Sequence, residues 1–348
     1  MEIDLGTLLT IFYCVIDDLY RTSFAALKPL RPGPEPSFSD SEVITVTLLA
    51  QWQGDRSERG FVRYVRKHWR RFFPKMLSQS RFNRRARDLC GVISALGPQV
   101  SQQVVEQFGL QPAYNVMDCV PVPLMRRCRG IHARLFANQV GIGHGGSDDE
   151  WYYGVQLLAV VNAPGLITGF MVGPANTEER WLAEALLRWR REPRAVVPRA
   201  GALAPVLGPT HKAGGQRLGP TGPLASWLSV GQCSAEPYLA DAGFEGKAWV
   251  RHWWEHYQAM VLTKADYEKL LPAERRLENH WLSSLRQVIE TVNGCLVGVL
   301  GLKFPRARTY WGLLTRLGAK VAAFNLALYL NQQFRRPTFS LINPITLD

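Results

Sequence analysis

The chain has 348 residues, of which 47% are hydrophobic and 20% are charged. This composition excludes a disordered chain, and the length allows two domains. Lys and Arg number 41 against 29 Asp and Glu, giving a net charge of +12. Such a balance favours a polyanionic partner, with nucleic acid ahead of an anionic membrane. The simpler alternative is a basic surface that serves solubility alone.

The cysteines and the first residues both indicate a protein of the cell interior. Six cysteines are scattered without a C-x-x-C pair, which excludes a zinc knuckle and a redox motif of that kind. The N-terminal segment is acidic and has no basic stretch ahead of an apolar one, which excludes an ordinary secretory signal. We expect a cytoplasmic protein, associated with the nucleoid if its partner is DNA.

Residues 1–108 are expected to form a helical N-terminal region. Apolar residues recur at helical spacing in Leu8–Tyr20 and in Val43–Leu49. Ser39, with Glu42 three residues later, provides a helix start before the second of these runs. We therefore predict an all-α N-terminal domain, and the basic stretch inside it makes DNA binding its expected role.

That stretch runs from residue 63 to residue 87 and holds ten basic residues and no acidic one. A solvated helix face normally mixes both signs, so this pattern is unusual for a plain surface helix. The helix expected after Ser78 resembles one that docks on a DNA groove, although phosphate contacts alone would explain its charge. The predicted nucleic-acid-binding residues, including four basic residues further along the chain, are Arg63, Arg66, Lys67, Arg70, Arg71, Arg81, Arg84, Arg85, Arg87, Lys264, Lys303, Arg306 and Arg308.

From residue 109 the pattern changes to apolar runs alternating with helices, which favours an α/β domain over residues 109–335. A buried strand is predicted to end in Asp118. The uncharged stretch that follows has Asn-x-Pro-Gly in its middle, so it predicts a β-hairpin over Tyr152–Val172 and not a membrane span. A helix over Asn176–Arg190 should come next, opened by a capping box between Asn176 and Glu179. Three strands and then a helix is the order of ribonuclease-H-like domains, with a mixed sheet flanked by helices.

The second half of this domain is interrupted by residues 191–235, which are rich in Pro, Gly and Ala and predict a long loop or a disordered insertion. Residues 336–348 are expected to form a C-terminal tail. The last helix of the domain is amphipathic, which is typical of a core-packing helix, so no membrane role is expected. The other predicted elements are a strand at Tyr238–Asp241, a helix through Trp254, a short strand at Ala259–Thr263, and helices at Trp281–Leu300 and Trp311–Leu330.

Three carboxylates carry the predicted chemistry. Asp118 and Asp241 each follow a buried strand, and Glu290 lies on a helix among apolar neighbours. Such an oxygen-only set suits Mg²⁺ or Mn²⁺ and not zinc, and two ions would stabilise the attacking and leaving oxygens of a phosphoryl displacement. Arg286 lies one helical turn before Glu290 and can hold the carboxylate or a DNA phosphate. Taken singly, an Asp after a strand more often caps a turn, and a helical Glu is more often solvated.

Two other patterns carry little weight. Residues 252–256 fit the H-x-x-E-H motif of inverted zinc proteases, but patterns of five residues recur by chance. Gly141, Gly143 and Gly146 fit G-x-G-x-x-G, but no helix opens after them to bind a pyrophosphate. We interpret that glycine-rich segment as a flexible loop.

Several stretches that together span nearly the whole chain match one family in the same order. They are FSDSEVITVTLLA, SQSRFNRRARDL, MDCVPVPL, WYYGVQL, VGPANTEERW, LADAGFEGKAWV, RQVIETV and PRARTYWGLLTRLGAKVAAFNLALYLN. Through them the sequence resembles the bacterial insertion-sequence transposases with a ribonuclease-H-like Asp, Asp, Glu catalytic domain.

The resemblance implies metal-dependent DNA cleavage and strand transfer at the ends of a mobile element, with Asp118, Asp241 and Glu290 as the triad and Arg286 as the arginine four residues before the glutamate. It further implies two Mg²⁺ or Mn²⁺ ions, double-stranded DNA of the terminal inverted repeats and of the target as partner, and a homodimer on DNA.

The sequence departs from that family at three places, one of which is the insertion from about residue 191 to 235, longer than the family's usual link. A Lys commonly lies seven residues after the glutamate, and here Val297 occupies the position, with Lys303 the next candidate. Gln156 lies in a segment where relatives often have a Lys and a His. These departures leave open an alternative, a catalytically impaired or domesticated transposase that acts as a DNA-binding protein.

Overall fold

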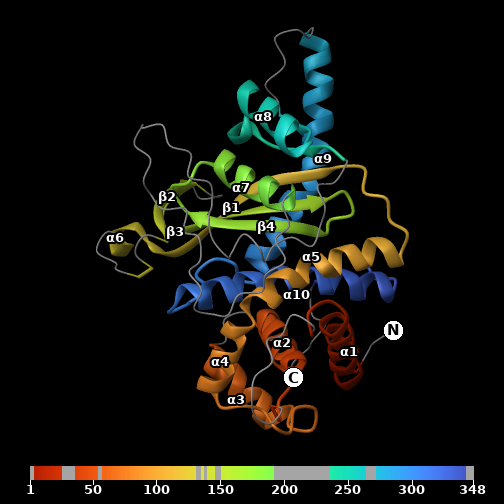
Figure 1. Cartoon of the computed structure of the whole chain (residues 1–348), viewed down its shortest axis with the longest axis vertical. Helices are drawn as coiled ribbons and strands as arrows, with labels where there is room; N and C mark the ends of the chain where they lie inside the picture. Colours follow the sequence, from red (N-terminus) through yellow and green to blue (C-terminus); the bar gives the residue numbers. More distant parts are fainter. Residues whose placement is uncertain are drawn as a thin grey trace.

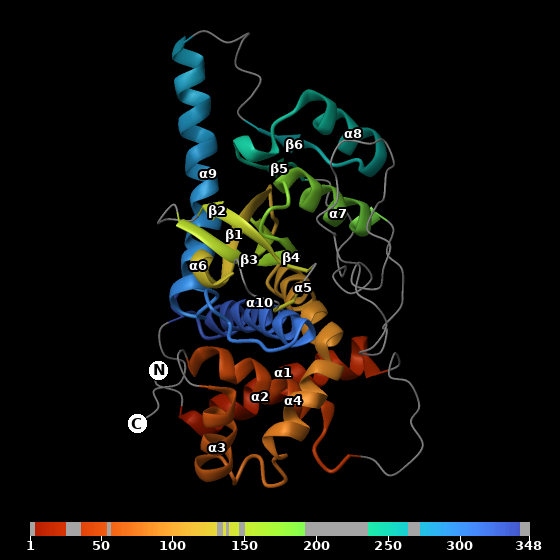
Figure 2. The ribbon, with the colours of Figure 1, turned by 90° about the vertical axis from the view of Figure 1, so that its left-hand side faces the viewer.

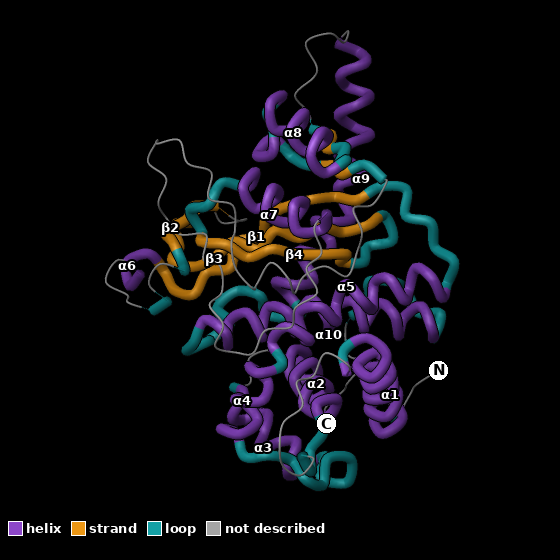
Figure 3. The backbone as a smooth tube through the Cα atoms, viewed as in Figure 1, coloured by secondary structure: helices purple, strands orange, loops and turns teal. Residues whose placement is uncertain are grey.

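The computed structural model describes residues 4–25, 36–53, 57–130, 135–136, 139–145, 150–191, 236–263 and 272–341. In this part the chain is mixed α/β, with a curled six-stranded sheet flanked by helices (Figure 1 and Figure 3). Of the sequence predictions, the insertion beyond Arg191, the basic residue Lys264 and the tail beyond Leu341 lie outside the described residues.

The described residues before the sheet are mainly helical, as predicted, and polar caps explain where two of these helices begin. The Ser39 side chain accepts a hydrogen bond from the Glu42 backbone N–H, and the Glu42 side chain accepts one from the Ser39 backbone N–H. The capping box is therefore complete. Asp4 caps the first helix by accepting from the backbone of Thr7 over 3.1 Å. The elements are α1 (Leu5–Ser23), α2 (Asp40–Leu49), η2 (Ala50–Gln53), α3 (Glu58–His68), α4 (Gln79–Asp88) and α5 (Cys90–Gln107).

Two helices, α5 and α10 (Tyr310–Gln333), form a layer between the sheet and helices α1–α4 (Figure 2). Glycine allows their close approach, because a Cβ at Gly97 would lie 2.8 Å from Val321 Cγ1 and one at Gly318 would lie 2.6 Å from Ser94 Oγ. Asn325 ties the layer to the sheet, accepting from the Ile167 backbone over 2.9 Å and donating to the Ile167 carbonyl over 2.8 Å.

Among the described helices, α10 alone is long and apolar enough to cross a membrane, and 94% of its apolar stretch is buried inside the fold. Burial on all sides is the usual state of a core helix in a folded domain. This agrees with the core-packing role predicted for Trp311–Leu330.

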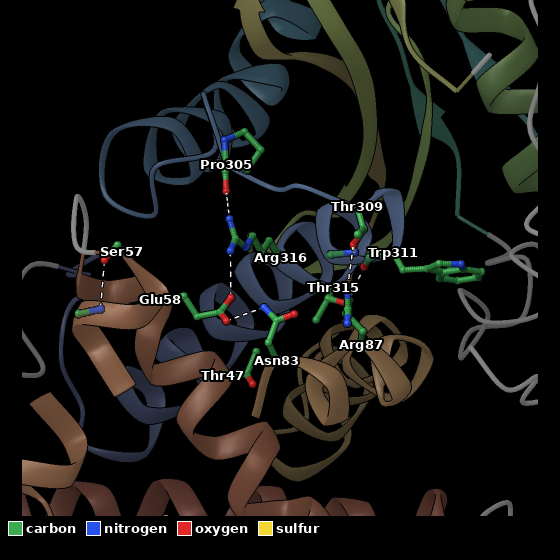
Figure 4. A network of polar contacts seen from close by, with 12 residues as sticks. Thr47, Ser57, Glu58, Asn83, Arg87, Pro305, Thr309, Trp311, Thr315 and Arg316 are labelled. Carbon is green, nitrogen blue, oxygen red and sulfur yellow. Dashed lines mark hydrogen bonds and ion pairs between the residues drawn. The ribbon is translucent and has the colours of Figure 1, made fainter. Parts of the chain in front are cut away.

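A second polar network fastens helices α3 and α4 to α10 (Figure 4). Arg316 on α10 donates to Glu58 Oε2 over 2.9 Å and also donates to the carbonyl of Pro305. Asn83 on α4 donates to the other oxygen of Glu58 over 2.5 Å. Both oxygens of Glu58 are therefore used, and the network orients the basic helices relative to the rest of the chain.

The sheet has three antiparallel strands followed by two parallel ones. In space the order is β4, β3, β1, β5, β6, with β1 antiparallel to β3 and parallel to β5, and β2 pairs with the first part of β3. The hairpin predicted at Tyr152–Val172 is confirmed as β3 and β4. The strands are β1 (Asn115–Arg126), β2 (Gly141–Gly145), β3 (Glu150–Asn162), β4 (Ile167–Pro174), β5 (Tyr238–Leu239) and β6 (Val261–Leu262), and the short helix α6 (Arg127–Gly130) follows β1.

Two strand predictions were wrong. The strand expected to end at Asp118 continues to Arg126, because β3 offers pairing partners along that whole length. Its prolines are tolerated because no hydrogen bond is lost at them. The Asn115 N–H points toward β5 and donates to the Pro237 carbonyl. Backbone directions alternate along a strand, so the nitrogen of Pro121 points to the same side, beyond the end of β5, where no strand needs an N–H. The glycine-rich segment interpreted as a flexible loop is strand β2 over Gly141–Gly145, paired with the start of β3.

Helices α7 (Glu179–Arg191) and α8 (Lys247–Tyr257) cover one face of the sheet, and α9 (Pro272–Gly298) lies against the other side (Figure 2). Arg190 on α7 donates to the Tyr238 hydroxyl over 2.9 Å. Glu184 on α7 accepts from Trp253 Nε1 over 3.0 Å and lies 3.1 Å from His252 Nε2. The H-x-x-E-H segment is thus part of the α7–α8 contact.

Candidate active site

Asp118 lies inside β1, on the side of the sheet that faces α9. Its Oδ1 accepts from the Cys119 backbone over 3.0 Å, and its Oδ2 accepts from the Asn293 side chain over 2.9 Å. β5 pairs with β1 only up to Val116, so the two strands separate just before Asp118. The carboxylate therefore lies where the sheet opens, beside a helix of distant sequence.

Asp241 lies two residues after β5, at the N-cap of a short 3-10 helix, η4 (Ala242–Phe244). Its Oδ1 accepts from the Gly243 backbone over 2.9 Å. Its Oδ2 lies 3.8 Å from Nη2 of Arg286 on α9, in an ion pair of which the Arg286 side chain is mostly buried and the Asp241 side chain is half-buried. Asp241 thus caps a turn through Oδ1, as an aspartate after a strand commonly does, while its Oδ2 is directed toward α9.

Helix α9 presents three polar residues along one stripe toward these aspartates. Arg286, Glu290 and Asn293 are spaced four and three residues apart, which places them on the same helix face. The first contacts Asp241 and the last contacts Asp118. Glu290, between them, is exposed, and its charge raises the pKa of Asp118 after the larger effects of burial and Asp241. The three predicted carboxylates thus lie in one neighbourhood.

Glu179, the first residue of α7, is a fourth carboxylate in this neighbourhood, and sequence reasoning missed its position. The predicted capping box is wrong, because α7 begins at Glu179 and Asn176 lies in the preceding turn. The Glu179 side chain lies instead against the η4 turn, where a Cβ at Gly243 would be 1.9 Å from its Oε2. Only glycine at position 243 leaves room for this carboxylate beside Asp241.

The site holds an excess of negative charge in a partly buried place. Burial first, and the charge of Asp241 second, raise the pKa of Asp118 from 3.8 to about 6, against the opposing effect of Arg286. Burial, followed by the charges of Asp241 and Asp118, raises the pKa of Glu179 from 4.5 to about 7. Arg286 lowers both values but does not offset the shifts, so an additional cation would be stabilised here.

The donor chemistry of this site fits a hard divalent cation, because its ligand atoms are carboxylate oxygens. The spacing fits less well. Among the described residues, no set of three His, Cys, Asp or Glu side chains lies close enough together to hold a metal ion. The same holds for the H-x-x-E-H segment, where His256 Nδ1 lies 3.0 Å from the His252 carbonyl and His252 contacts Glu184.

The predicted DNA-binding residues divide into two groups. Arg85 is turned inward, donating to Asp40 and to the Phe38 carbonyl, and Arg87 is half-buried with Nη1 3.4 Å from Thr309 Oγ1. Lys303 is also half-buried. The exposed members are Arg63, Arg66, Lys67, Arg70, Arg71, Arg81, Arg84, Arg306 and Arg308. Those on α3, α4 and their connection lie across the α5–α10 layer from the sheet (Figure 2).

Of the departures from the transposase pattern, the two single residues Gln156 and Val297 are both half-buried. Gln156 in β3 lies on the face of the sheet opposite Asp118. Cys119 pairs with Leu158, so these two side chains share a face, and because side chains alternate along each strand, Gln156 is on that face and Asp118 is on the other. The Oε1 atom of Gln156 is buried without a hydrogen-bond partner. Val297 lies on α9 one turn beyond Asn293.

Comparison with protein-family models, with curated proteins and with solved structures found no match to this chain.

Proposed function

We propose that the chain is a transposase of the insertion-sequence type, which cleaves and joins DNA strands through a ribonuclease-H-like catalytic domain. The observation that carries the proposal is that the residues on either side of Glu290 on its helix face contact the two aspartates. Arg286 contacts Asp241 over 3.8 Å, and Asn293 contacts Asp118 over 2.9 Å. Two aspartates from the sheet and one glutamate from a later helix are the predicted triad. The strand order, three antiparallel strands and then two parallel ones beside β1, supports the ribonuclease-H-like assignment.

In the proposed reaction an oxygen nucleophile attacks a backbone phosphorus, a phosphorus–oxygen bond breaks, and a free 3′-hydroxyl leaves. Asp118, Asp241 and Glu290 would hold Mg²⁺ or Mn²⁺, which when bound supplies stabilisation of the attacking and leaving oxygens. Asn293 and Arg286 orient the two aspartates, each by a direct contact. The carboxylate of Glu179, with its pKa of about 7, can accept or release a proton close to the site at neutral pH.

Double-stranded DNA is the proposed partner, and the exposed arginines of α3, α4 and their connection are its proposed contact surface. Their charge favours phosphate binding, which gives affinity without sequence preference. On DNA we propose a homodimer, because two element ends must be joined and each triad serves one end. The proposed location is the cytoplasm, at the nucleoid.

A strand-cleavage assay tests this function. Purified protein is incubated with Mn²⁺ and a duplex that carries the element's terminal inverted repeat with its flanking DNA, labelled at one 3′-flank. We expect a nick at the repeat boundary that requires the cation and is lost in Asp241→Asn. Full-length substrate under conditions where the protein binds the duplex would contradict the proposal.

A second candidate function is a DNA-binding protein that no longer cleaves. It is favoured by Val297, which lies where the family commonly has a lysine. It is also favoured by the spacing of the carboxylates, because among the described residues no three lie close enough together to hold a metal ion. The same assay separates the two, because this candidate binds the repeat and leaves it intact. Restoring the amine with Val297→Lys should then raise cleavage if the loss lies in that residue alone.

A further inference from the structure

Two basic side chains on α10 hold the segment 300–305, which directly follows α9. Arg316 and Lys320 are four residues apart, so they lie one turn apart on the same face of the helix. Arg316 donates to the carbonyl of Pro305 (Figure 4), and Lys320 donates to the carbonyl of Leu300. Both ends of the segment are therefore bound to one helix.

The same segment is fastened to α9 and to the sheet through its backbone. Hydrogen bonds of 3.1 and 2.9 Å run from the N–H groups of Leu300 and Leu302 back to the last turn of α9. A further one of 2.9 Å runs from the Phe304 N–H to the carbonyl of Pro123 in β1, the strand that carries Asp118. The segment thus joins the end of α9 to the strand of the first carboxylate.

Lys320 lies in an unfavourable place for a cation. The residue is only 7% exposed, and its hydrogen bonds go to neutral oxygens, the Gln51 side chain over 3.0 Å and the Leu300 carbonyl. Burial first, and the charge of Arg316 second, lower the pKa of Lys320 from 10.5 to about 8, so the amine still carries its proton at neutral pH. Burying a charge in this way costs free energy. An apolar side chain would serve packing better, which indicates that the amine is present for the groups that it holds.

The end of α9 matters to the carboxylate site because this helix contacts the fold through its second half. Its fully buried side chains among the described residues are Ile289, Val292 and Leu296, whereas its first turns project past the sheet (Figure 2). Glu290 lies within the buried stretch, so a shift of the end of the helix is carried to its carboxylate. A misplacement of about 1 Å can cost about 100-fold in rate.

We propose that Lys320 and Arg316 are positioning residues for Glu290, because they set the level of α9 against β1 and so keep the third carboxylate beside the two aspartates for a divalent cation. This inference rests on the proposed function. The same two side chains also bind Gln51 over 3.0 Å and Glu58 over 2.9 Å. The helical region that carries the proposed DNA surface therefore takes part in setting the site.

Direct measurement of Mn²⁺ binding tests this role without relying on catalysis. Free Mn²⁺ is followed by electron paramagnetic resonance while the full chain is titrated. Lys320→Met removes both hydrogen bonds and keeps an apolar stem, so the dissociation constant for Mn²⁺ should rise about tenfold or more, the usual effect of losing a group that orients a ligand residue. Asn325→Ala is the matched control, because Asn325 is buried on the same helix and its hydrogen bonds go to α5 and β4.

A double-mutant cycle shows whether the effect passes through Glu290. On a Glu290→Gln background the third carboxylate is absent, so Lys320→Met should raise the dissociation constant little further. In the strand-cleavage assay Lys320→Met should raise the half-saturating Mn²⁺ concentration and leave the rate at saturating Mn²⁺ nearly unchanged. Arg316→Gln, at a half-buried position, loses the Pro305 contact and should act in the same direction, which keeps the test decisive if Lys320→Met does not fold.

The other outcomes overturn the proposal. Mn²⁺ binding and half-saturation equal to the wild type in both variants would remove the positioning role and leave the proposed function standing. An equal rise in Asn325→Ala, or a rise from Lys320→Met that persists in full on the Glu290→Gln background, would assign the effect to a general loss of stability. A wild-type chain that neither binds Mn²⁺ nor cleaves DNA would remove the proposed function as well.

Discussion

The side-chain amide of Asn293 donates a hydrogen bond of 2.9 Å to Oδ2 of Asp118, a residue 175 positions earlier in the chain. This bond fixes α9 against β1 at the level of the carboxylate. Because Glu290 lies one turn before Asn293, the same bond fixes how far along the sheet Glu290 is held. The position of the third carboxylate therefore depends on an amide that is not itself part of the triad.

Replacing Asn293 by Ala should slow cleavage while leaving DNA binding unchanged. We expect a rate loss of about 10- to 100-fold, the usual effect of removing a group that orients a ligand residue, and a stability loss of about 1 kcal/mol for the hydrogen bond. Cleavage rates in Mn²⁺ and binding to the same duplex are the measurements. Thr291→Ala, on an exposed part of the same helix, is the control. A rate equal to that of the control would show that the bond serves packing alone.

The triad makes a sharper prediction. Asp118→Asn, Asp241→Asn and Glu290→Gln keep side-chain volume and remove one charge each, so each should abolish cleavage with little change in DNA affinity. Glu255→Gln, on the exposed side of α8, should cleave like the wild type. Binding and cleavage are measured on one labelled duplex. Any triad variant that still cleaves at the wild-type rate has no place in the triad.

The arginines of α4 separate by their contacts. Arg81 and Arg84 are exposed, whereas Arg85 donates to Asp40 and to the Phe38 carbonyl. Replacing Arg81 and Arg84 by Gln should lower the slope of log K against log salt by about two, since each phosphate contact contributes about 0.9. Arg85→Gln should instead lower the unfolding free energy and leave that slope unchanged. The reverse result would place Arg85, and not its neighbours, on the DNA.

Periodicity and turn residues in the sequence were enough to predict the helices before the sheet and the β3–β4 hairpin, whereas the triad of Asp118, Asp241 and Glu290 stays a prediction. The spacing of Arg286, Glu290 and Asn293 along one helix face could also have identified Asn293. In each case the signal is local, because it lies in the order of residues within a single helix or strand.

Three features could not be derived in that way, because tertiary partners decide them. β1 continues past Asp118 only because β3 extends beside it. Glu179 looked like part of a helix cap, and its carboxylate turns instead to a glycine 64 positions later, where no Cβ opposes it. Arg85 had the same sequence context as Arg84, and its ion pair with Asp40 follows from how α4 packs on α2.

The raised pKa values of Asp118 and Glu179 predict how stability depends on pH. A carboxyl group whose pKa is higher in the folded state than in the unfolded state binds its proton more tightly when folded, so its contribution is present in acid and is lost as the pH rises through the folded value. For Asp118 the pKa rises from 3.8 to about 6, mainly through burial. The unfolding free energy should therefore fall between about pH 4 and about pH 7. Since one pKa unit corresponds to about 1.4 kcal/mol, Asp118→Asn should raise the unfolding free energy by about 1 to 3 kcal/mol at about pH 8.

Denaturant unfolding at about pH 4.5 and about pH 8 measures this effect. Glu290→Gln, which changes an exposed carboxyl group, is the matched variant. An Asp118→Asn protein that is less stable than the wild type at the higher pH would show that the Asn293 hydrogen bond outweighs the burial of charge.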